Sequence, residues 1–138
     1  MIDDNDLKEL LKKSKTIAIV GCSRDPNKAA HRVPKYLKEQ GYEIIPVNPF
    51  EDEILGINVR KSLSEIGKSI DIVDIFRPSD ECFQVIKESI ELKPKAVWMQ
   101  LGIENEEAAK LAENHDICVV ENKCIYIEHK RLINTSNN

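Results

Sequence analysis

Hydrophobic residues along this chain fall into short apolar runs, separated by stretches with the periodicity of amphipathic helices. Five runs have the nearly continuous apolar character of strands that are covered on both faces of a parallel sheet. They lie at residues 16–20, 43–47, 70–76, 96–99 and 117–120. Helical spacing is found at residues 4–13, from 30–33 to Gly41, at 79–91 and after Asn105. This alternation predicts an α/β fold, with a Rossmann-like doubly wound parallel five-stranded sheet in a single domain.

The same pattern predicts a topology and the edge at which a ligand binds. We expect the strand order 3-2-1-4-5, because right-handed crossovers leave few arrangements for such a sheet. Ligands of doubly wound sheets bind at the carboxyl ends of the strands, near the point where the strand order reverses. Four loops meet this condition, namely residues 21–32, 47–52, 76–79 and 99–105.

Prolines and capping residues refine the predicted elements. A proline is tolerated in the first turn of a helix, so Pro34 places the start of its helix near residues 30–33. Pro46 has no N–H, and we therefore expect irregular or weak pairing in the second strand. Ser79 and Asn105 are suitable N-caps for the helices that follow them.

The remaining segments complete one domain over residues 1–138, with its core at about 14–132. We expect a loop or a small extended excursion around Gly56 at residues 50–61. The tail through Leu132 is predicted to form a short helix, and residues 134–138 to fray.

The loop after the first strand differs from a dinucleotide-binding turn in its glycines. Gly21 ends the strand and no further glycine follows before Gly41, whereas the usual fingerprint has three. Backbone N–H groups and the next helix N-terminus still suit this loop to an anion. One hydroxyl and three cations add to it, on Ser23, Arg24, Lys28 and Arg32. The alternative is an ordinary tight turn with charges on its surface.

The end of the second strand also departs from an NAD site. An acidic side chain is needed there for the ribose hydroxyls, and this chain has Val47, Asn48 and Pro49 instead. A standard dinucleotide site is therefore not expected. Pro49 offers a stiff ledge for a flat base, and Asn48 offers a donor and an acceptor, although Asn-Pro also makes an ordinary strand-ending turn.

Composition and charge argue against two classes of partner. The chain has 20 basic and 24 acidic residues, a net charge of −4, which gives no basic excess for nucleic acid. No apolar run approaches the roughly 20 residues that cross a bilayer. The acidic residues 1–6 lack the features of a secretory signal, so we expect a cytoplasmic location with reduced cysteines.

The four cysteines are not spaced as a zinc site, because no two form a C-x-x-C pair, and we expect no metal. Cys82 and Cys118 are expected to be small buried apolar residues. Cys22 lies where a helix N-terminus lowers the pKa of a thiol. Cys22 or Cys124 is therefore a candidate for a mixed disulfide with a thiol-bearing ligand.

Candidates for catalysis are few. His115 and His129 fall in stretches typical of a charged surface, and Trp98 lies in a strand that is predicted to be core. Asp71 and Asp74 alternate to opposite faces of one strand, so they do not form an adjacent acid–base pair. The residues thus favour binding over chemistry.

Five short motifs together resemble one family. They are residues 19–23 (Ile-Val-Gly-Cys-Ser), 46–49 (Pro-Val-Asn-Pro), 74–78 (Asp-Ile-Phe-Arg-Pro), 98–103 (Trp-Met-Gln-Leu-Gly-Ile) and 122–125 (Asn-Lys-Cys-Ile). Each motif is weak alone, but the five in this order resemble the small stand-alone CoA-binding proteins. Their domain is similar to the CoA-binding domain of the succinyl-CoA synthetase alpha subunit.

The resemblance implies a site for coenzyme A (CoA) or an acyl-CoA in these loops. By that likeness the site comprises Gly21, Cys22, Ser23, Lys28 and Arg32 near the phosphates, Val47, Asn48 and Pro49 at the adenine or ribose, Phe76, Arg77 and Pro78 as a wall, and Gln100, Gly102 and Ile103 along the pantetheine. His31 stands where the likeness leads us to expect a small hydroxyl residue.

Three functions follow as hypotheses. The resemblance favours a non-catalytic module that binds CoA or acyl-CoA, alone, as a homodimer or with a protein partner. The alternative is the CoA-binding subunit of a split acyl-CoA ligase, which needs a separate ATP-binding chain. A small NAD(P)-dependent enzyme fits least, because the additional glycines and the strand-end acid are missing.

Overall fold

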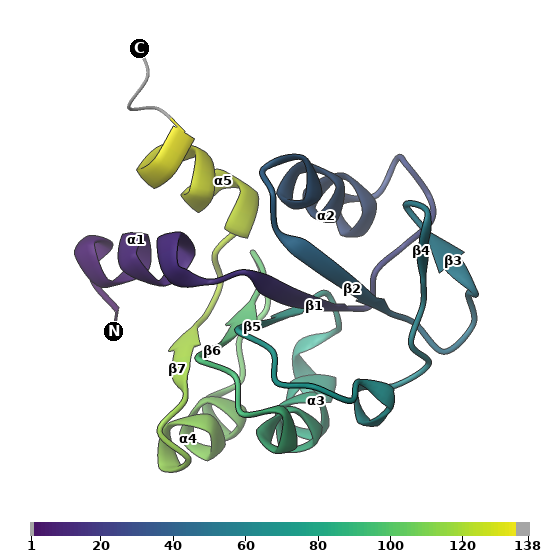
Figure 1. Ribbon diagram of the computed structural model, residues 1–138. Helices are drawn as coiled ribbons and strands as arrows, with labels where there is room; N and C mark the ends of the chain where they lie inside the picture. Colours follow the sequence, from purple (N-terminus) through teal and green to yellow (C-terminus); the bar gives the residue numbers. More distant parts are fainter. Residues whose placement is uncertain (1, 135–138) are drawn as a thin grey trace.

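A computed structural model, which describes residues 2–134, has a five-stranded parallel sheet with helices on both faces (Figure 1). The strands of this sheet are β1 (Thr16–Val20), β2 (Glu43–Val47), β5 (Ile72–Ile75), β6 (Ala96–Met99) and β7 (Cys118–Val120). The helices are α1 (Asp4–Lys13), α2 (Ala29–Glu39), α3 (Cys82–Ser89), α4 (Glu106–Asn114) and α5 (Ile125–His129). The predicted fold class is therefore confirmed. None of the described helices has the length and apolar character needed to span a membrane.

The two faces of the sheet carry separate hydrophobic clusters. Helices α1, α2 and α5 cover one face, where Leu7, Leu37 and Ile125 pack with strand residues such as Ile19. Trp98 is fully buried in this cluster, as predicted, and its indole N–H donates to the carbonyl of Lys123 at 2.8 Å. Helices α3 and α4 cover the other face. Burial on both sides explains why the strands are apolar along their whole length.

The predicted strand order is wrong. The sheet runs β2-β1-β5-β6-β7, which is 2-1-3-4-5 when its strands are counted along the chain. β2 lies at an edge of the sheet. The N–H that Pro46 lacks would have pointed to the outer side, away from β1, so the pairing of β1 and β2 loses no hydrogen bond. β5 is fully buried and pairs with β1 on one side and β6 on the other. The strand order therefore reverses between β1 and β5.

The outer edge of β2 is closed by a short excursion of the chain. Residues 50–61 contain the hairpin β3 (Glu53–Ile54) and β4 (Ile57–Asn58), which confirms the expected extended excursion. Arg60 then donates its N–H to the carbonyl of Pro46 at 2.9 Å and accepts from the N–H of Asn48 at 3.0 Å. Its backbone thus satisfies the end of β2.

Pro34 lies deeper in its helix than the sequence predicted. α2 begins at Ala29, so Pro34 is the sixth helical residue and not part of the first turn. A proline at this position leaves the carbonyl four residues earlier without its helical donor. That carbonyl belongs to Ala30, and it accepts instead from the N–H of Ser23 at 3.0 Å. The proline therefore allows the loop after β1 to be fastened to α2.

The capping predictions had different outcomes. Asn105 caps α4 as expected, because its side chain accepts from the N–H of Ala108 at 2.9 Å. Ser79 does not cap α3 with its side chain; it starts a 3₁₀ turn, Ser79–Glu81, that precedes the helix. Its hydroxyl accepts from the N–H of Glu104 at 3.1 Å. Ser79 thus connects the loops after β5 and β6.

The C-terminal segment packs against the start of the chain. α5 continues into a π-helical turn, Lys130–Asn134, where Arg131 pairs with Asp4 of α1 at 2.8 Å. His129 is buried, not exposed as predicted, and shares a 2.8 Å hydrogen bond with the hydroxyl of Tyr36. Burial lowers the pKa of His129. The predicted fraying falls mostly on residues 135–138, which lie outside the described residues.

Candidate functional site

Gly21 brings the loops after β1 and β5 into direct contact. Its φ is +83°, and a Cβ built at this position would lie 2.4 Å from the carbonyl oxygen of Phe76. Its N–H donates to the carbonyl of Val47 at 3.0 Å. Gly21 therefore sits where three strand ends meet, and only glycine combines this φ with so close an approach.

The loop that follows Gly21 is held by hydrogen bonds before any ligand binds. The hydroxyl of Ser23 accepts from the N–H of Asp25 at 3.0 Å, which leaves its own hydrogen able to donate. The carbonyl of Ser23 lies 2.8 Å from Nδ1 of His31. His31 thus acts on this loop through its ring, in place of the small hydroxyl residue that the resemblance led us to expect.

Positive charge surrounds the N-terminus of α2. Lys28 is the N-cap residue and makes no side-chain capping bond, and the first turn of the helix contains no acid. Arg24, Lys28 and Arg32 all have exposed side chains. This combination of helix N-terminus and cations favours a bound anion, as the sequence predicted.

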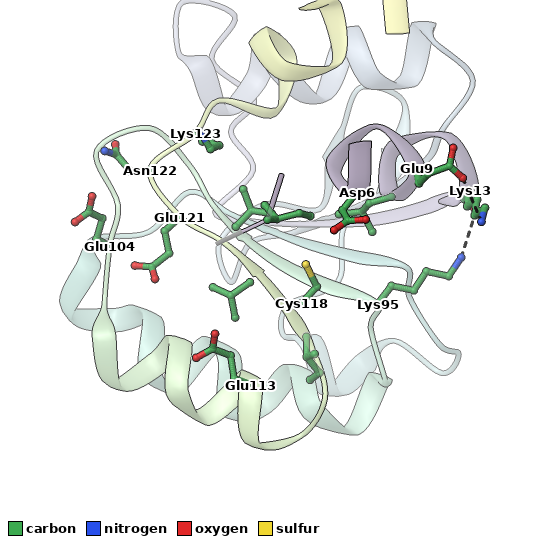
Figure 2. A pocket seen from close by; sticks show the side chains of 15 residues that line it. Asp6, Glu9, Lys13, Lys95, Glu104, Glu113, Cys118, Glu121, Asn122 and Lys123 are labelled. Carbon is green, nitrogen blue, oxygen red and sulfur yellow. Dashed lines mark hydrogen bonds and ion pairs between the residues drawn. The ribbon is translucent and has the colours of Figure 1, made fainter. Parts of the chain in front are cut away.

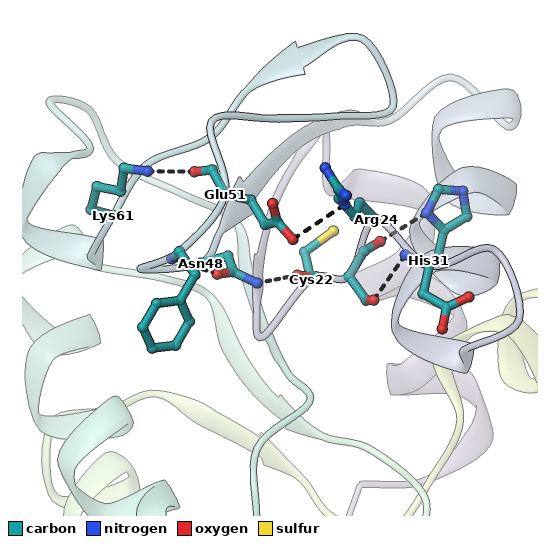
Figure 3. Close-up of polar contacts among 9 residues, drawn as sticks. Cys22, Arg24, His31, Asn48, Glu51 and Lys61 are labelled. Atoms are coloured by element: carbon teal, nitrogen blue, oxygen red, sulfur yellow. Dashed lines mark hydrogen bonds and ion pairs between the residues drawn. The ribbon is translucent and has the colours of Figure 1, made fainter.

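Asn48 ties the loops after β1 and β2 together, as Figure 3 shows. Its Nδ2 donates to the carbonyl of Cys22 at 2.9 Å, and its Oδ1 accepts from the N–H of Phe50 at 2.8 Å. Arg24 reaches across to Glu51 at 3.6 Å. The amide of Asn48 therefore supports the loops. Of its predicted neighbours, Val47 is buried and Pro49 is exposed.

The loop after β5 contributes a partly apolar wall. Phe76 is half-buried against the core, and Pro78 is exposed. The guanidinium of Arg77 makes three hydrogen bonds to the carboxylate of Glu81, at 2.8 to 3.0 Å. An anion must share Arg77 with Glu81 or displace it.

The three residues predicted for the site in the loop after β6 differ in how deeply they are buried. Gln100 is 4% exposed, and its side chain points inward to Asp74 and to the N–H of Ile125. Gly102 is exposed with φ +86°, and its N–H donates to Oδ1 of Asn122 at 2.6 Å. Ile103 is half-buried against the core. Of these three residues, Gly102 and Ile103 thus lie nearer the surface of the loop, and Gln100 lies beneath them.

Sequence reasoning assigned no role to Asn122, which holds Gly102 in place. Asn122 itself has φ +56°, a conformation that asparagine tolerates better than most residues. Its N–H also donates to the carbonyl of Ile103 at 3.1 Å. An asparagine two residues after the end of a predicted strand was the available signal.

Asp74 is fully buried beneath these loops. Its Oδ1 accepts from the amide of Gln100, and its Oδ2 has no hydrogen-bond partner among the described residues. Burial raises the pKa of Asp74 well above the usual range, although the bond from Gln100 opposes this. Asp71 lies before the strand and accepts from the N–H groups of Lys15 and Thr16, at 2.7 and 3.1 Å. The two acids therefore have separate surroundings.

The expected activation of Cys22 is wrong. Its side chain is completely buried, and burial, followed by the charge of Asp74, raises the pKa of the thiol to about 12. Cys82 is buried as predicted, whereas Cys118 is only half-buried on β7. Cys124 is half-buried as well. A thiol with so high a pKa is a poor nucleophile, so Cys22 is not a candidate for a mixed disulfide.

The loops are thus joined side by side in the order of the sheet, with an anion-suited helix N-terminus at the point where the strand order reverses. This combination defines a Rossmann-like domain of the kind that binds phosphate-bearing cofactors. The sequence model of the CoA binding domain family matches residues 15–130. The chain belongs to this family, which confirms the resemblance seen in its motifs.

Relatives and solved structures agree with this assignment. The chain is 42% identical to the uncharacterized protein YneT of Bacillus subtilis, over 90% of this chain and 92% of that protein. A hypothetical protein from Pyrococcus horikoshii superposes with a TM-score of 0.93 and 37% identity, covering 96% of this chain and 93% of the other.

A second group of relatives is much longer than this chain. The alpha subunit of an ADP-forming acetate–CoA ligase II from Pyrococcus furiosus is 39% identical over 82 residues. The match covers 59% of this chain but only 18% of that subunit. This chain therefore corresponds to a small part of the ligase subunit.

Proposed function

We propose that the chain is a single CoA-binding domain that holds CoA or an acyl-CoA without catalysing a reaction on it. The observation that carries this proposal is the anion-suited opening between the loops at the carboxyl ends of β1, β2 and β5, which we call the mouth of the site. There, the N-terminus of α2 has no capping side chain and no acid in its first turn. Because the chain belongs to the CoA binding domain family, CoA or an acyl-CoA is the ligand that we propose for this mouth.

The proposed ligand lies across the joined loops, with its phosphates at the N-terminus of α2. Gly21, Cys22 and Ser23 contribute backbone, and Lys28 and Arg32 contribute charge. The adenine or ribose borders Val47, Asn48 and Pro49. Phe76, Arg77 and Pro78 form the wall, and the pantetheine follows Gly102 and Ile103, with Gln100 supporting the path from below.

The state of the nearby reactive groups supports binding without chemistry. The Cys22 thiol is buried with a raised pKa, and the side chain of Arg77 is bound to Glu81. Nδ1 of His31 is occupied by the carbonyl of Ser23. The Cys22 thiol is therefore poorly suited to attack a ligand, and Arg77 and Nδ1 of His31 are engaged in contacts within the protein.

The second candidate is a CoA-binding subunit of a split acyl-CoA ligase. The match to a ligase alpha subunit, of which it covers 18%, favours this candidate. It requires a separate ATP-binding chain in the same compartment, which we propose to be the cytoplasm. Co-purification of such a chain, and CoA-dependent ATP turnover by the pair, would distinguish it from a stand-alone binding module.

Isothermal titration with CoA, acetyl-CoA, NAD and ATP at one salt concentration tests the proposal. We expect CoA or acetyl-CoA to bind far more tightly than NAD or ATP. The variants Lys28→Ala and Arg32→Ala should weaken CoA binding, whereas Lys87→Ala, an exposed cation on α3, should leave it unchanged. Equal affinity for all four ligands, or no binding, would contradict the proposed function.

A further inference from the structure

The two edge strands of the sheet, β2 and β7, differ in whether their outer side is covered. The backbone of Arg60 covers the outer edge of β2, where Pro46 already lacks an N–H. β7 pairs with β6 on its inner side, and no strand in residues 2–134 pairs with its outer side. An open edge of this kind presents unpaired backbone groups that can accept another strand.

The open edge of β7 lies in a groove of about 1010 Å³. Figure 2 shows this groove, with Asp6 on α1 to one side, Glu113 on α4 to the other and Cys118 of β7 between them. Its lining includes every residue from Ile117 to Lys123. Within this run the extended strand is β7 itself, Cys118–Val120, which corresponds to about 10 Å at about 3.3 Å per residue.

The floor of this groove is apolar while its walls are acidic. Leu10, Ile117 and Val119 are among the apolar lining residues. The lining has three lysines and five acids, the acids being Asp6, Glu9, Glu104, Glu113 and Glu121. Lys13 pairs with Glu9 at 3.2 Å and Lys95 with Asp71 at 3.7 Å, and Lys123 lies beyond the end of β7.

Among the acids of the lining, Asp6 on α1 and Glu113 on α4 lie on the two sides of β7. Neither has an ion-pair partner within the described part of the chain. Burial raises the pKa of the Cys118 thiol, and the charges of Asp6 and Glu113 raise it further, while the positive charge of the N-terminus lowers it. Both carboxylates thus act on the middle of the open edge, and the groove attracts positive charge.

A second copy of this chain does not fit the groove well. Two-fold pairing of β7 with itself would place α1 beside its copy and α4 beside its copy. Asp6 would then approach the other Asp6, and Glu113 the other Glu113. Like charges at such short range oppose pairing, so the occupant should carry basic side chains.

We propose that the open edge of β7 binds an extended, basic and apolar segment of a partner protein, which adds a sixth strand to the sheet between α1 and α4. Backbone hydrogen bonds to Val119 would supply much of the affinity, and cationic side chains near Asp6 and Glu113 the specificity. This inference does not rest on the binding of CoA, because the groove lies along a different edge of the sheet.

The backbone of Val119 offers a selective way to close this edge. Cys118 donates its N–H inward, to the carbonyl of Lys95 at 3.0 Å. Backbone groups alternate along a strand, so the N–H of Val119 points outward. Val119→Pro therefore removes a donor for the incoming strand and no donor of the β6–β7 pairing. Val119→Thr keeps the N–H and is the matched control.

The probe is a blocked seven-residue peptide, Val-Lys-Lys-Val-Lys-Lys-Val, labelled with a fluorophore and titrated by polarisation. Successive side chains of a strand point to opposite faces, so this sequence directs lysines to both Asp6 and Glu113. We expect saturable binding to the wild type and to Val119→Thr, and a loss of about tenfold or more with Val119→Pro. Asp6→Lys combined with Glu113→Lys should abolish binding, whereas Glu39→Lys, an exposed site on α2, should not. The charge variant keeps the test decisive if Val119→Pro does not fold.

Three results would overturn the proposal. One is no binding of the Lys/Val peptide by the wild type. Another is equal binding by Val119→Pro, or by the charge variant, and the wild type. The third is sedimentation showing a wild-type dimer that Val119→Pro dissociates, because this edge would then be occupied by a second copy of the chain.

Discussion

Asp74 shows, at the scale of one residue, how burial in this protein changes the pKa of a carboxyl group. The carboxyl group is fully buried, with one oxygen bonded to Gln100 and the other without a partner among the described residues. Burial raises the pKa well above its usual range, so the folded protein holds the proton more tightly than the unfolded chain. The stability contributed by this proton is complete below the unfolded pKa and is lost as the pH rises through the folded one.

Asp74→Asn should therefore stabilise the protein at neutral pH. Asparagine has the same shape and no charge to suppress, and each unit of pKa shift removed is worth about 1.4 kcal/mol. Urea unfolding of wild type and variant at pH 5 and pH 8 measures the effect. We expect the free energy gained by the variant to increase with pH.

Asp71→Asn is the control with the opposite sign. Its burial opposes ionisation, but hydrogen bonds from Lys15 and Thr16 lower the pKa of Asp71 overall. That stability is present above the unfolded pKa and is lost as the pH falls through the folded pKa. The advantage of the wild type over Asp71→Asn should therefore grow from acid to neutral pH. Parallel pH profiles for the two variants would contradict our assignment of Asp74.

Gly21→Ala should destabilise the fold by about 2–4 kcal/mol, from a positive φ and from the collision with the carbonyl of Phe76. Gly102→Ala has a similar φ of +86°, but no atom lies within 4 Å of its new Cβ, so it should cost about 1–2 kcal/mol. Denaturant midpoints of the two variants give the comparison. Equal losses would mean that the close approach at Gly21 has no energetic weight.

At the scale of elements, local signals predicted the helices and strands well, while pairing between distant strands was not predicted. Asn105 marked the start of α4 correctly because a cap depends on residues three positions away. Strand order depends on contacts between segments far apart in sequence, and the order 3-2-1-4-5 was wrong. Pro46 did contain the missing information, since a proline suits an edge strand better than a central one.

Burial of single residues was hard to predict for the same reason. His129 lies in a charged stretch, but the rings of Tyr36 and Tyr42 pack against it, at centroid distances of 5.4 and 5.6 Å. Cys22 follows a strand end and yet is covered completely. The four predicted loops do follow the strands β1, β2, β5 and β6. The hydrogen bonds of Asn48 and Gln100 were not predicted, because they depend on partners distant in sequence.

Asn105→Ala should destabilise the protein by about 1–2 kcal/mol, since it removes the cap of α4. The same side chain donates to the carbonyl of Ser79 at 2.8 Å, which adds to the loss. Asn105→Asp retains a capping oxygen but loses the donor to Ser79, so it should recover only part of the stability. Thermal unfolding followed by circular dichroism measures both variants, and an equal loss in both would show that capping is not the cause.

At the scale of the whole molecule, an acidic protein presents a cationic mouth to the proposed ligand. The net charge is −4, but Lys28 and Arg32 lie at the N-terminal end of α2, and Arg24 lies in the loop before it, where it pairs with Glu51. Attraction between exposed charges is screened by salt over about 10 Å at 0.1 M. The affinity for a polyanion should therefore respond to salt even though the protein itself carries net negative charge.

Raising the salt concentration should weaken the binding of CoA several-fold and leave the binding of pantetheine, which lacks the phosphates, nearly unchanged. Competition titrations of the two ligands over a salt series measure this. Equal salt dependence for both would place the phosphates of CoA away from α2.

The N–H of Ser23 donates a hydrogen bond to the carbonyl of Ala30, which lacks a helical donor because of Pro34. This hydrogen bond has a consequence for the rate at which the ligand associates. A loop already fastened to its helix does not have to rearrange when the ligand arrives, so encounter alone limits the reaction. In stopped-flow mixing, the observed rate constant should rise in proportion to CoA concentration without levelling off. Pro34→Ala gives Ala30 a competing helical donor, and the slower, saturating phase of a loosened loop should then appear.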